Sequence, residues 1–172
     1  MKLQQIWVIS SNGLQLFSYT INNRDKITNQ DKKINNFLKA SGIYNILTYF
    51  NDFLLGEKTD ALLTNDLLWV IHYQVIHHYD TKKILEFAVI AVAQIDLTIP
   101  VIDQKRVLLE FCKRIALEFY EECGEYVEAF TNINLKMFEG FRPRCIRLIK
   151  SFEEDIAEML EQRLVAWHQK NK

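Results

Sequence analysis

The chain has 172 residues, of which 49% are hydrophobic and 25% are charged, and its 21 basic side chains nearly balance 22 acidic ones. This length suits a single domain, residues 1–172, with a sizeable core. Because binding to phosphates requires a clear surplus of Lys and Arg on one face, a net charge of −1 argues against a nucleic-acid partner.

Two strands joined by a tight turn are predicted at the start of the chain. Residues 5–10 and 14–20 are rich in β-branched and aromatic side chains, and Asn12-Gly13 between them suits the positive φ angles of a hairpin turn. Alternation along the second strand predicts that one side carries Leu14, Leu16 and Ser18, and the other Gln15, Phe17 and Tyr19.

A polar connection and a helix are expected next. Residues 22–36 are rich in Asn, Asp and Lys, which predicts a mobile connection. The helix then runs from about residue 31 or 41 to residue 55, because apolar residues recur at steps of three and four: Ile43, Ile46, Leu47, Phe50 and Leu54.

Three further strands are predicted over residues 61–64, 67–75 and 84–94. Asn65-Asp66 and residues 79–82 are typical of the turns between them. From Phe87 to Ala93 every residue is apolar, so we expect the last of these strands to lie at the centre of the sheet or to be covered on both sides.

From Asp103 onward the apolar period changes from two to 3.6, which indicates helices. The first is expected to end near Cys123-Gly124, and a short extra helix fits residues 126–141. A long amphipathic helix fits residues 144–170. The apolar stripes of the two long helices are Leu108, Cys112, Ile115 and Phe119, and then Ile149, Phe152, Ile156, Leu160, Leu164 and Trp167. The predicted fold is α+β, with a five-stranded antiparallel sheet flanked by helices in the order β-β-α-β-β-β-α-α.

This order of elements resembles the longin fold. The matching pieces are the strand Ile6-Trp7-Val8-Ile9 with its turn and return strand, the helix near Ser41-Gly42-Ile43, the central strand 87–93, and an amphipathic helix that carries Phe111, Phe119 and Tyr120. The resemblance implies a three-layer arrangement and a platform for small GTPases or a subunit of a vesicle-trafficking complex. Implied partners are a small GTPase or another protein of longin or roadblock fold, and a homodimer is a further possibility.

The sequence predicts a cytoplasmic protein with no transmembrane anchor. No secretory signal is visible, and the most apolar stretch, residues 84–102, is interrupted by four polar or helix-breaking residues. The three cysteines are odd in number and far apart, which is typical of reduced thiols rather than disulfides.

No motif predicts catalysis, a cofactor or a metal, so we expect a protein that is not an enzyme. His72, His77 and His78 are the best metal ligands on offer, but two adjacent histidines on a strand point to opposite faces. Cys112 falls on an apolar helical stripe, where a cysteine normally packs as a small hydrophobe.

The favoured function is that of a scaffold that binds other proteins. Aromatic side chains away from an apolar stripe are typical of interfaces, and Arg142, Arg144, Arg147 and Lys150 form the only concentrated basic patch. The candidate contacts are Tyr44, Thr48, Tyr49, Arg144, Arg147 and Trp167. The alternatives are a small-ligand sensor of profilin- or PAS-like type and, with less support, a hydrolase of unrecognised geometry.

Overall fold

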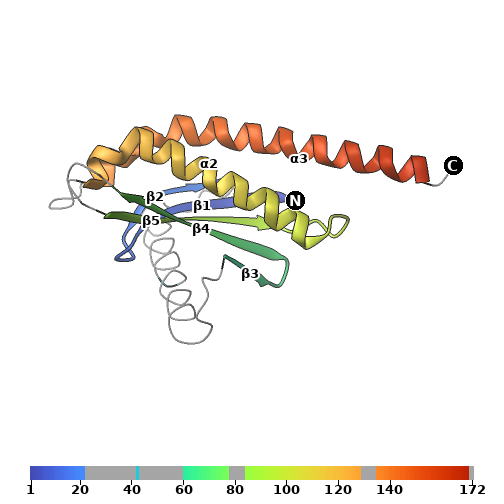
Figure 1. Cartoon of the computed structure of the whole chain (residues 1–172), viewed down its shortest axis with the longest axis horizontal. Coiled ribbons are helices and arrows are strands. Elements are labelled where there is room, and N and C mark those ends of the chain that lie inside the picture. Colours follow the sequence, from blue (N-terminus) through green and yellow to red (C-terminus); the bar gives the residue numbers. More distant parts are fainter. Residues whose placement is uncertain (22–41, 43–59, 78–83, 129–134, 171–172) are drawn as a thin grey trace, which may run out of the picture.

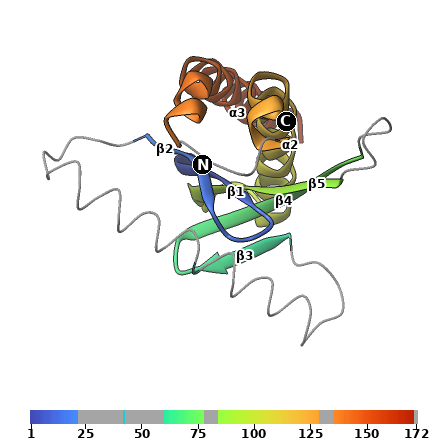
Figure 2. The same cartoon turned by 90° about the vertical axis from the view of Figure 1, so that its left-hand side faces the viewer.

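Five antiparallel strands form one sheet, and the helices that follow them lie together on one of its faces (Figures 1 and 2). The structure is a computed structural model, which describes residues 1–21, 42, 60–77, 84–128 and 135–170. The expected α+β class is confirmed. Of the helix expected from about residue 31 or 41 to residue 55, only residue 42 is described, and it is helical. The elements are β1 (Lys2–Ser10), β2 (Gln15–Thr20), β3 (Ala61–Thr64), β4 (Leu67–His77), β5 (Ile84–Gln94), α2 (Val101–Glu128), the 3-10 helix η2 (Leu135–Phe141) and α3 (Arg142–Lys170).

The strand β5 occupies the centre of the sheet, as its sequence predicts. The strand order is β2-β1-β5-β4-β3, and β5 pairs along its length with β1 on one side and β4 on the other. Every residue from Phe87 to Ala93 is at most 2% exposed. A strand that is apolar on both faces avoids solvent in this position.

The two faces of the sheet carry separate apolar clusters. The first face packs under α2, η2 and α3, and includes Ile6, Val8, Val70 and Val89. The second face holds Trp7, Ile9, Ile71, Ala88, Ile90 and Val92, and the ring of Trp7 stacks on that of Trp69 at 5.8 Å between centroids. Within the described ranges, only strand residues belong to this second cluster.

The expected alternation along β2 is wrong after Leu16: Phe17 and Tyr19 lie on the same side of the sheet as Leu16, and Ser18 lies on the other side. Ile9 pairs with Gln15 while Val8 pairs with Phe17, so Leu16 is an extra residue in β2. Such a bulge breaks the period of two, and the side chains of Leu16 and Phe17 both join the cluster beneath the helices. The turn before β2 is as predicted, with Gly13 at a φ of 81°.

The expected end of a helix at Gly124 is also wrong, because α2 continues to Glu128. A Cβ atom at Gly124 would lie 2.8 Å from the ring of Tyr120, one turn earlier on the same helix. Glycine therefore serves here to admit the neighbouring aromatic ring, and it does not mark a helix stop.

Aromatic side chains join the two long helices to the sheet. Residues 126–141 divide between the last turn of α2 and η2, with residues 129–134 outside the described part. The ring of Phe119 in α2 contacts Phe87 of β5 and both Phe138 and Phe141 of η2, with centroids 5.3–5.7 Å apart. The 3-10 turn thus anchors the start of α3 over the sheet.

The connection between β5 and α2 depends on one buried polar side chain. Gln104 is fully buried; its amide donates to the carbonyls of Asp96 and Ile99, and its Oε1 accepts from the Asp96 amide at 2.9 Å. Hydrogen bonds from the side chain and amide of Thr98 also hold the pKa of Asp96 at about 2. The corner is therefore fixed by side-chain capping of its own backbone.

Replacing Gln104 should destabilise this corner strongly. In Gln104→Leu, three backbone groups lose their partner, two of them partly buried and one fully buried, so we expect the free energy of unfolding to fall by roughly 2–4 kcal/mol. Equilibrium denaturation in urea measures this loss. The matched control is Gln162→Leu on exposed α3, which should change stability by less than about 0.5 kcal/mol; equal losses in both variants would contradict the capping role.

Candidate functional site

Arg144 is the centre of an ion-pair network that joins α3 to α2. Its Nη1 lies 2.9 Å from Glu118 and 3.4 Å from Glu121, and its Nε lies 2.9 Å from Glu122. Its side chain is 32% exposed. This predicted partner contact is thus already occupied by three carboxylates of its own chain, and its role toward a partner stays a prediction.

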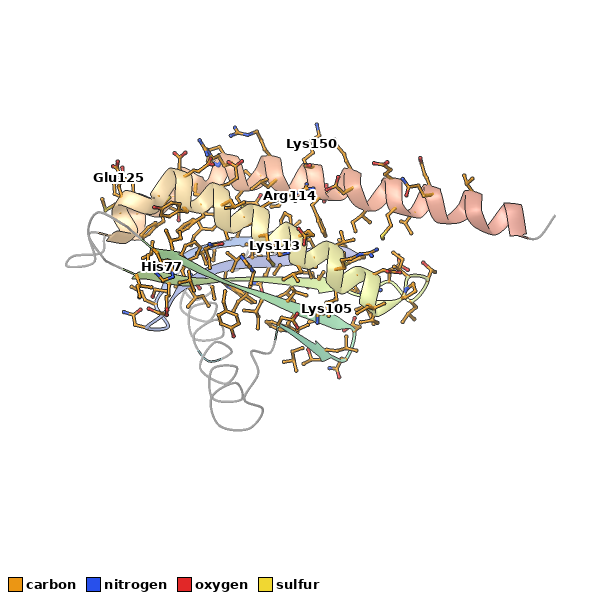
Figure 3. All side chains as sticks on the ribbon, in the orientation of Figure 1. His77, Lys105, Lys113, Arg114, Glu125 and Lys150 are labelled. Atoms are coloured by element: carbon orange, nitrogen blue, oxygen red, sulfur yellow. The ribbon has the colours of Figure 1, made fainter. Side chains whose placement is uncertain are left out.

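Arg147 and Lys150 lie on the outer side of α3, away from the sheet, where Figure 3 shows Lys150 pointing outward. Both are exposed, and neither takes part in an ion pair with another described residue. Of the predicted basic patch, Arg142 pairs with Glu139 at 2.7 Å and lies 5.6 Å from the ring centre of Tyr19. The patch is therefore divided between paired arginines at the start of α3 and unpaired charges one or two turns later.

A groove of about 300 Å³ lies between α2 and α3. Its apolar wall includes Phe111 and Phe152, whose ring centroids are 4.6 Å apart, together with Val107 and Met159. On its rim the guanidinium of Arg114 donates to Asp155 at 3.0 Å. Periodicity placed Phe111 and Phe152 on helices, but the groove itself depends on the relative position of two helices, which periodicity does not give.

Exposed leucines on the edge strand β3 form a second surface that sequence reasoning missed. Leu62 is 40% exposed and Leu63 is 50% exposed, on the outermost strand of the sheet. The sequence shows four apolar or β-prone residues here, but only the strand order reveals that they lie at an edge. A short edge strand with apolar side chains is a suitable site for pairing with another strand.

Several predicted contacts fall outside what the structure describes. Tyr44, Thr48 and Tyr49 lie in the segment 43–59, which is outside the described residues. Trp167 belongs to α3, but its side chain is likewise outside the described part. Their positions relative to Arg144 and Arg147 are therefore not described, and their roles stay predictions.

The histidines do not assemble with other ligands among the described residues. The ring of His72 interacts with the side chain of Gln74 at 3.1 Å on β4, while His77 is exposed at the end of that strand (Figure 3). His78 lies outside the described residues. In the described ranges, no group of three or more His, Cys, Asp or Glu side chains is placed to hold a metal ion.

All three cysteines are free and buried. Burial raises the pKa of the Cys123 thiol to about 11 and that of Cys145 to about 12, and it raises the pKa of Cys112 as well. The thiolate is the nucleophilic form of cysteine, so these environments oppose nucleophilic catalysis. The Cys112 thiol instead contacts the Val70 carbonyl at 3.8 Å, in the core.

The comparisons with known proteins add no relationship. No protein-family model matches the chain, and no curated protein matches its sequence significantly. Among the helices in the described part of the chain, none is both long and apolar enough to cross a membrane.

The Arg144 network supplies a test that separates a structural role from a partner contact. In Arg144→Met, three carboxylates lose their common counter-charge, so we expect a loss of about 1–2 kcal/mol in the free energy of unfolding, smaller at high salt. Denaturation of Arg147→Met is the matched control, and its stability should stay within about 0.5 kcal/mol of the original chain. An unchanged stability in Arg144→Met would contradict the structural role.

Proposed function

We propose that the chain is a non-enzymatic scaffold that binds a small GTPase, or a second subunit of longin or roadblock fold, in a trafficking-like or GTPase-regulating complex. The proposal draws on the resemblance of its element order to the longin fold. The five antiparallel strands followed by two long helices agree with that order in the described part of the chain. Small GTPases and subunits of longin or roadblock fold act on the cytoplasmic side of membranes, so the proposal includes a cytoplasmic location.

The observation that carries the proposal is the edge strand β3. It pairs with β4 through only four residues, and no described strand lies on its other side. The Ile71 amide donates to the Asp60 carbonyl at 2.8 Å, so the alternation of an antiparallel ladder turns the backbone groups of Ala61 and Leu63 outward. A partner strand placed there gains main-chain hydrogen bonds and an apolar contact with exposed leucines.

A rigid sheet favours this mode of recognition. The backbone of β4 is held by β5 along eleven paired residues, and β5 is held in turn by β1. A strand added at β3 therefore meets a pre-ordered edge, and little conformational entropy is lost on the scaffold side. Extension of the sheet binds a partner strand through main-chain hydrogen bonds and needs no catalytic step, as expected for a scaffold.

The groove between α2 and α3 favours a second candidate function, a small-ligand sensor. Its volume of about 300 Å³ and its apolar wall with a few charged rim groups suit a small amphipathic molecule. The charges on the rim are already paired, Arg114 with Asp155 across the groove and Arg106 and Glu110 with neighbours outside it. This candidate therefore depends chiefly on apolar contact.

The scaffold proposal is tested by affinity capture from native lysate, with GTPγS and GDP in parallel. We expect one small GTPase to be enriched in a single nucleotide state, or a longin- or roadblock-type subunit in both. In the double variant Leu62→Lys/Leu63→Lys, recovery should fall about tenfold, because lysine on an edge strand opposes strand addition.

The matched control is Leu117→Lys, which changes an exposed leucine on α2 and should leave capture intact. Melting temperatures should be alike in all three proteins. Equal capture by the β3 double variant would contradict strand addition, and recovery of neither class of partner by the original chain would contradict the scaffold itself.

The ligand-sensor candidate is tested by thermal shift against a panel of metabolites and nucleotides. A specific ligand should stabilise the protein by more than about 1 kcal/mol. Met159→Trp fills the groove and should abolish that stabilisation, whereas Ile146→Trp, outside the groove, should preserve it. Stabilisation that persists in Met159→Trp would show that the ligand binds elsewhere.

A further inference from the structure

The outer side of α3 carries a regular seam of exposed residues. Successive members are spaced by four, three, four, three and four residues, which is the spacing that keeps side chains in one line along a helix that packs on another helix. All six are exposed: Pro143, Arg147, Lys150, Glu154, Ala157 and Glu161. The buried stripe of the same helix, with Ile149, Phe152 and Ile156, faces the core instead.

The charges along α3 are separated into two blocks. Residues 142–150 contain three arginines and one lysine and no acidic residue, whereas residues 153–161 contain five acidic residues and no basic one. Arg142, Arg144 and Asp155 are paired within the chain. Among the described residues, no ion pair involves Arg147, Lys150, Glu153 or Glu154, although Lys150 and Glu154 are one helical turn apart.

This order is self-complementary when two copies of α3 are placed antiparallel. With a two-fold axis at the level of residue 152, Lys150 of one copy lies opposite Glu154 of the other. Arg147 then lies opposite Ala157 and next to Glu158, and each contact occurs twice by symmetry. Exposed Ile146 and Ala157 supply an apolar contact between the charges.

We propose that the outer side of α3 is the surface through which two copies of this chain associate in an antiparallel arrangement. A partner of a single charge would be attracted by one block and repelled by the other, so a second copy fits this surface better than a purely acidic or purely basic partner. Exposed ion pairs are individually weak and are screened by salt, so the association is weak and salt-sensitive. It uses α3, whereas the proposed scaffold function uses β3, so the two proposals are independent.

Charge reversal with a mixing experiment tests the proposal on the full chain. Sedimentation velocity at about 0.05 M salt should show reversible dimerisation that weakens at about 0.5 M. Arg147→Glu/Lys150→Glu makes every charged residue of the seam acidic, and Glu154→Lys/Glu161→Lys makes every charged residue of the seam basic. Each double variant alone should dimerise at least about tenfold more weakly than the original chain, because like charges then face each other.

An equimolar mixture of the two double variants should recover dimers, because the acidic seam then meets the basic one. The control Lys2→Glu/Glu125→Lys reverses two exposed charges outside α3 and should dimerise as the original chain does. Circular dichroism should be unchanged, since every altered side chain is exposed. A monomeric original chain at low salt, or dimerisation that survives either reversal, would overturn the proposal, as would a mixture that stays monomeric.

Discussion

The double-sided burial of β5 is the constraint on which the rest of the structure depends. Seven consecutive apolar residues, 87–93, have to be removed from water on both faces and along both edges. Pairing with β1 and β4 protects the edges, and the layer of α2, η2 and α3 covers one face. The aromatic contacts of Phe119 and the capped corner at Gln104 serve this layer, because they fix α2 over the strand that needs it.

How far the sequence predicts the fold follows from the range of the interactions involved. The bounds of β5 could be predicted because its apolar run is bounded by polar residues, and its central place was one of two arrangements that bury both faces. The stripe of α2 could be predicted because Leu108, Cys112, Ile115 and Phe119 repeat at helical spacing. The bulge at Leu16 could not be predicted, because a bulge depends on how β2 pairs with β1. The prediction that the helix ends near Gly124 is wrong, because the glycine makes room for the ring of Tyr120 and a glycine in the sequence does not show which neighbour requires it.

The same distinction applies to the candidate site. Arg144 and Arg147 are three residues apart and look alike in the sequence, yet one is held by three carboxylates of α2 and the other is unpaired among described residues. Only the packing of α3 on α2 separates them. The exposed edge at Leu63 and the groove beside Phe111 likewise arise from strand order and helix placement, so neither has a local signature.

The stacked indoles of Trp7 and Trp69 give the protein a built-in optical reporter. They come from β1 and β4, on opposite sides of β5, and their rings lie 5.8 Å apart with planes only 12° from parallel. Two stacked indoles in a fixed asymmetric position contribute to the near-ultraviolet circular dichroism, so this signal depends on the position of β1 relative to β4. It is lost when side-chain packing is lost, even where the helical signal in the far ultraviolet persists. Loss of sheet order can thus be followed spectroscopically without any label, separately from the helical signal of α2 and α3.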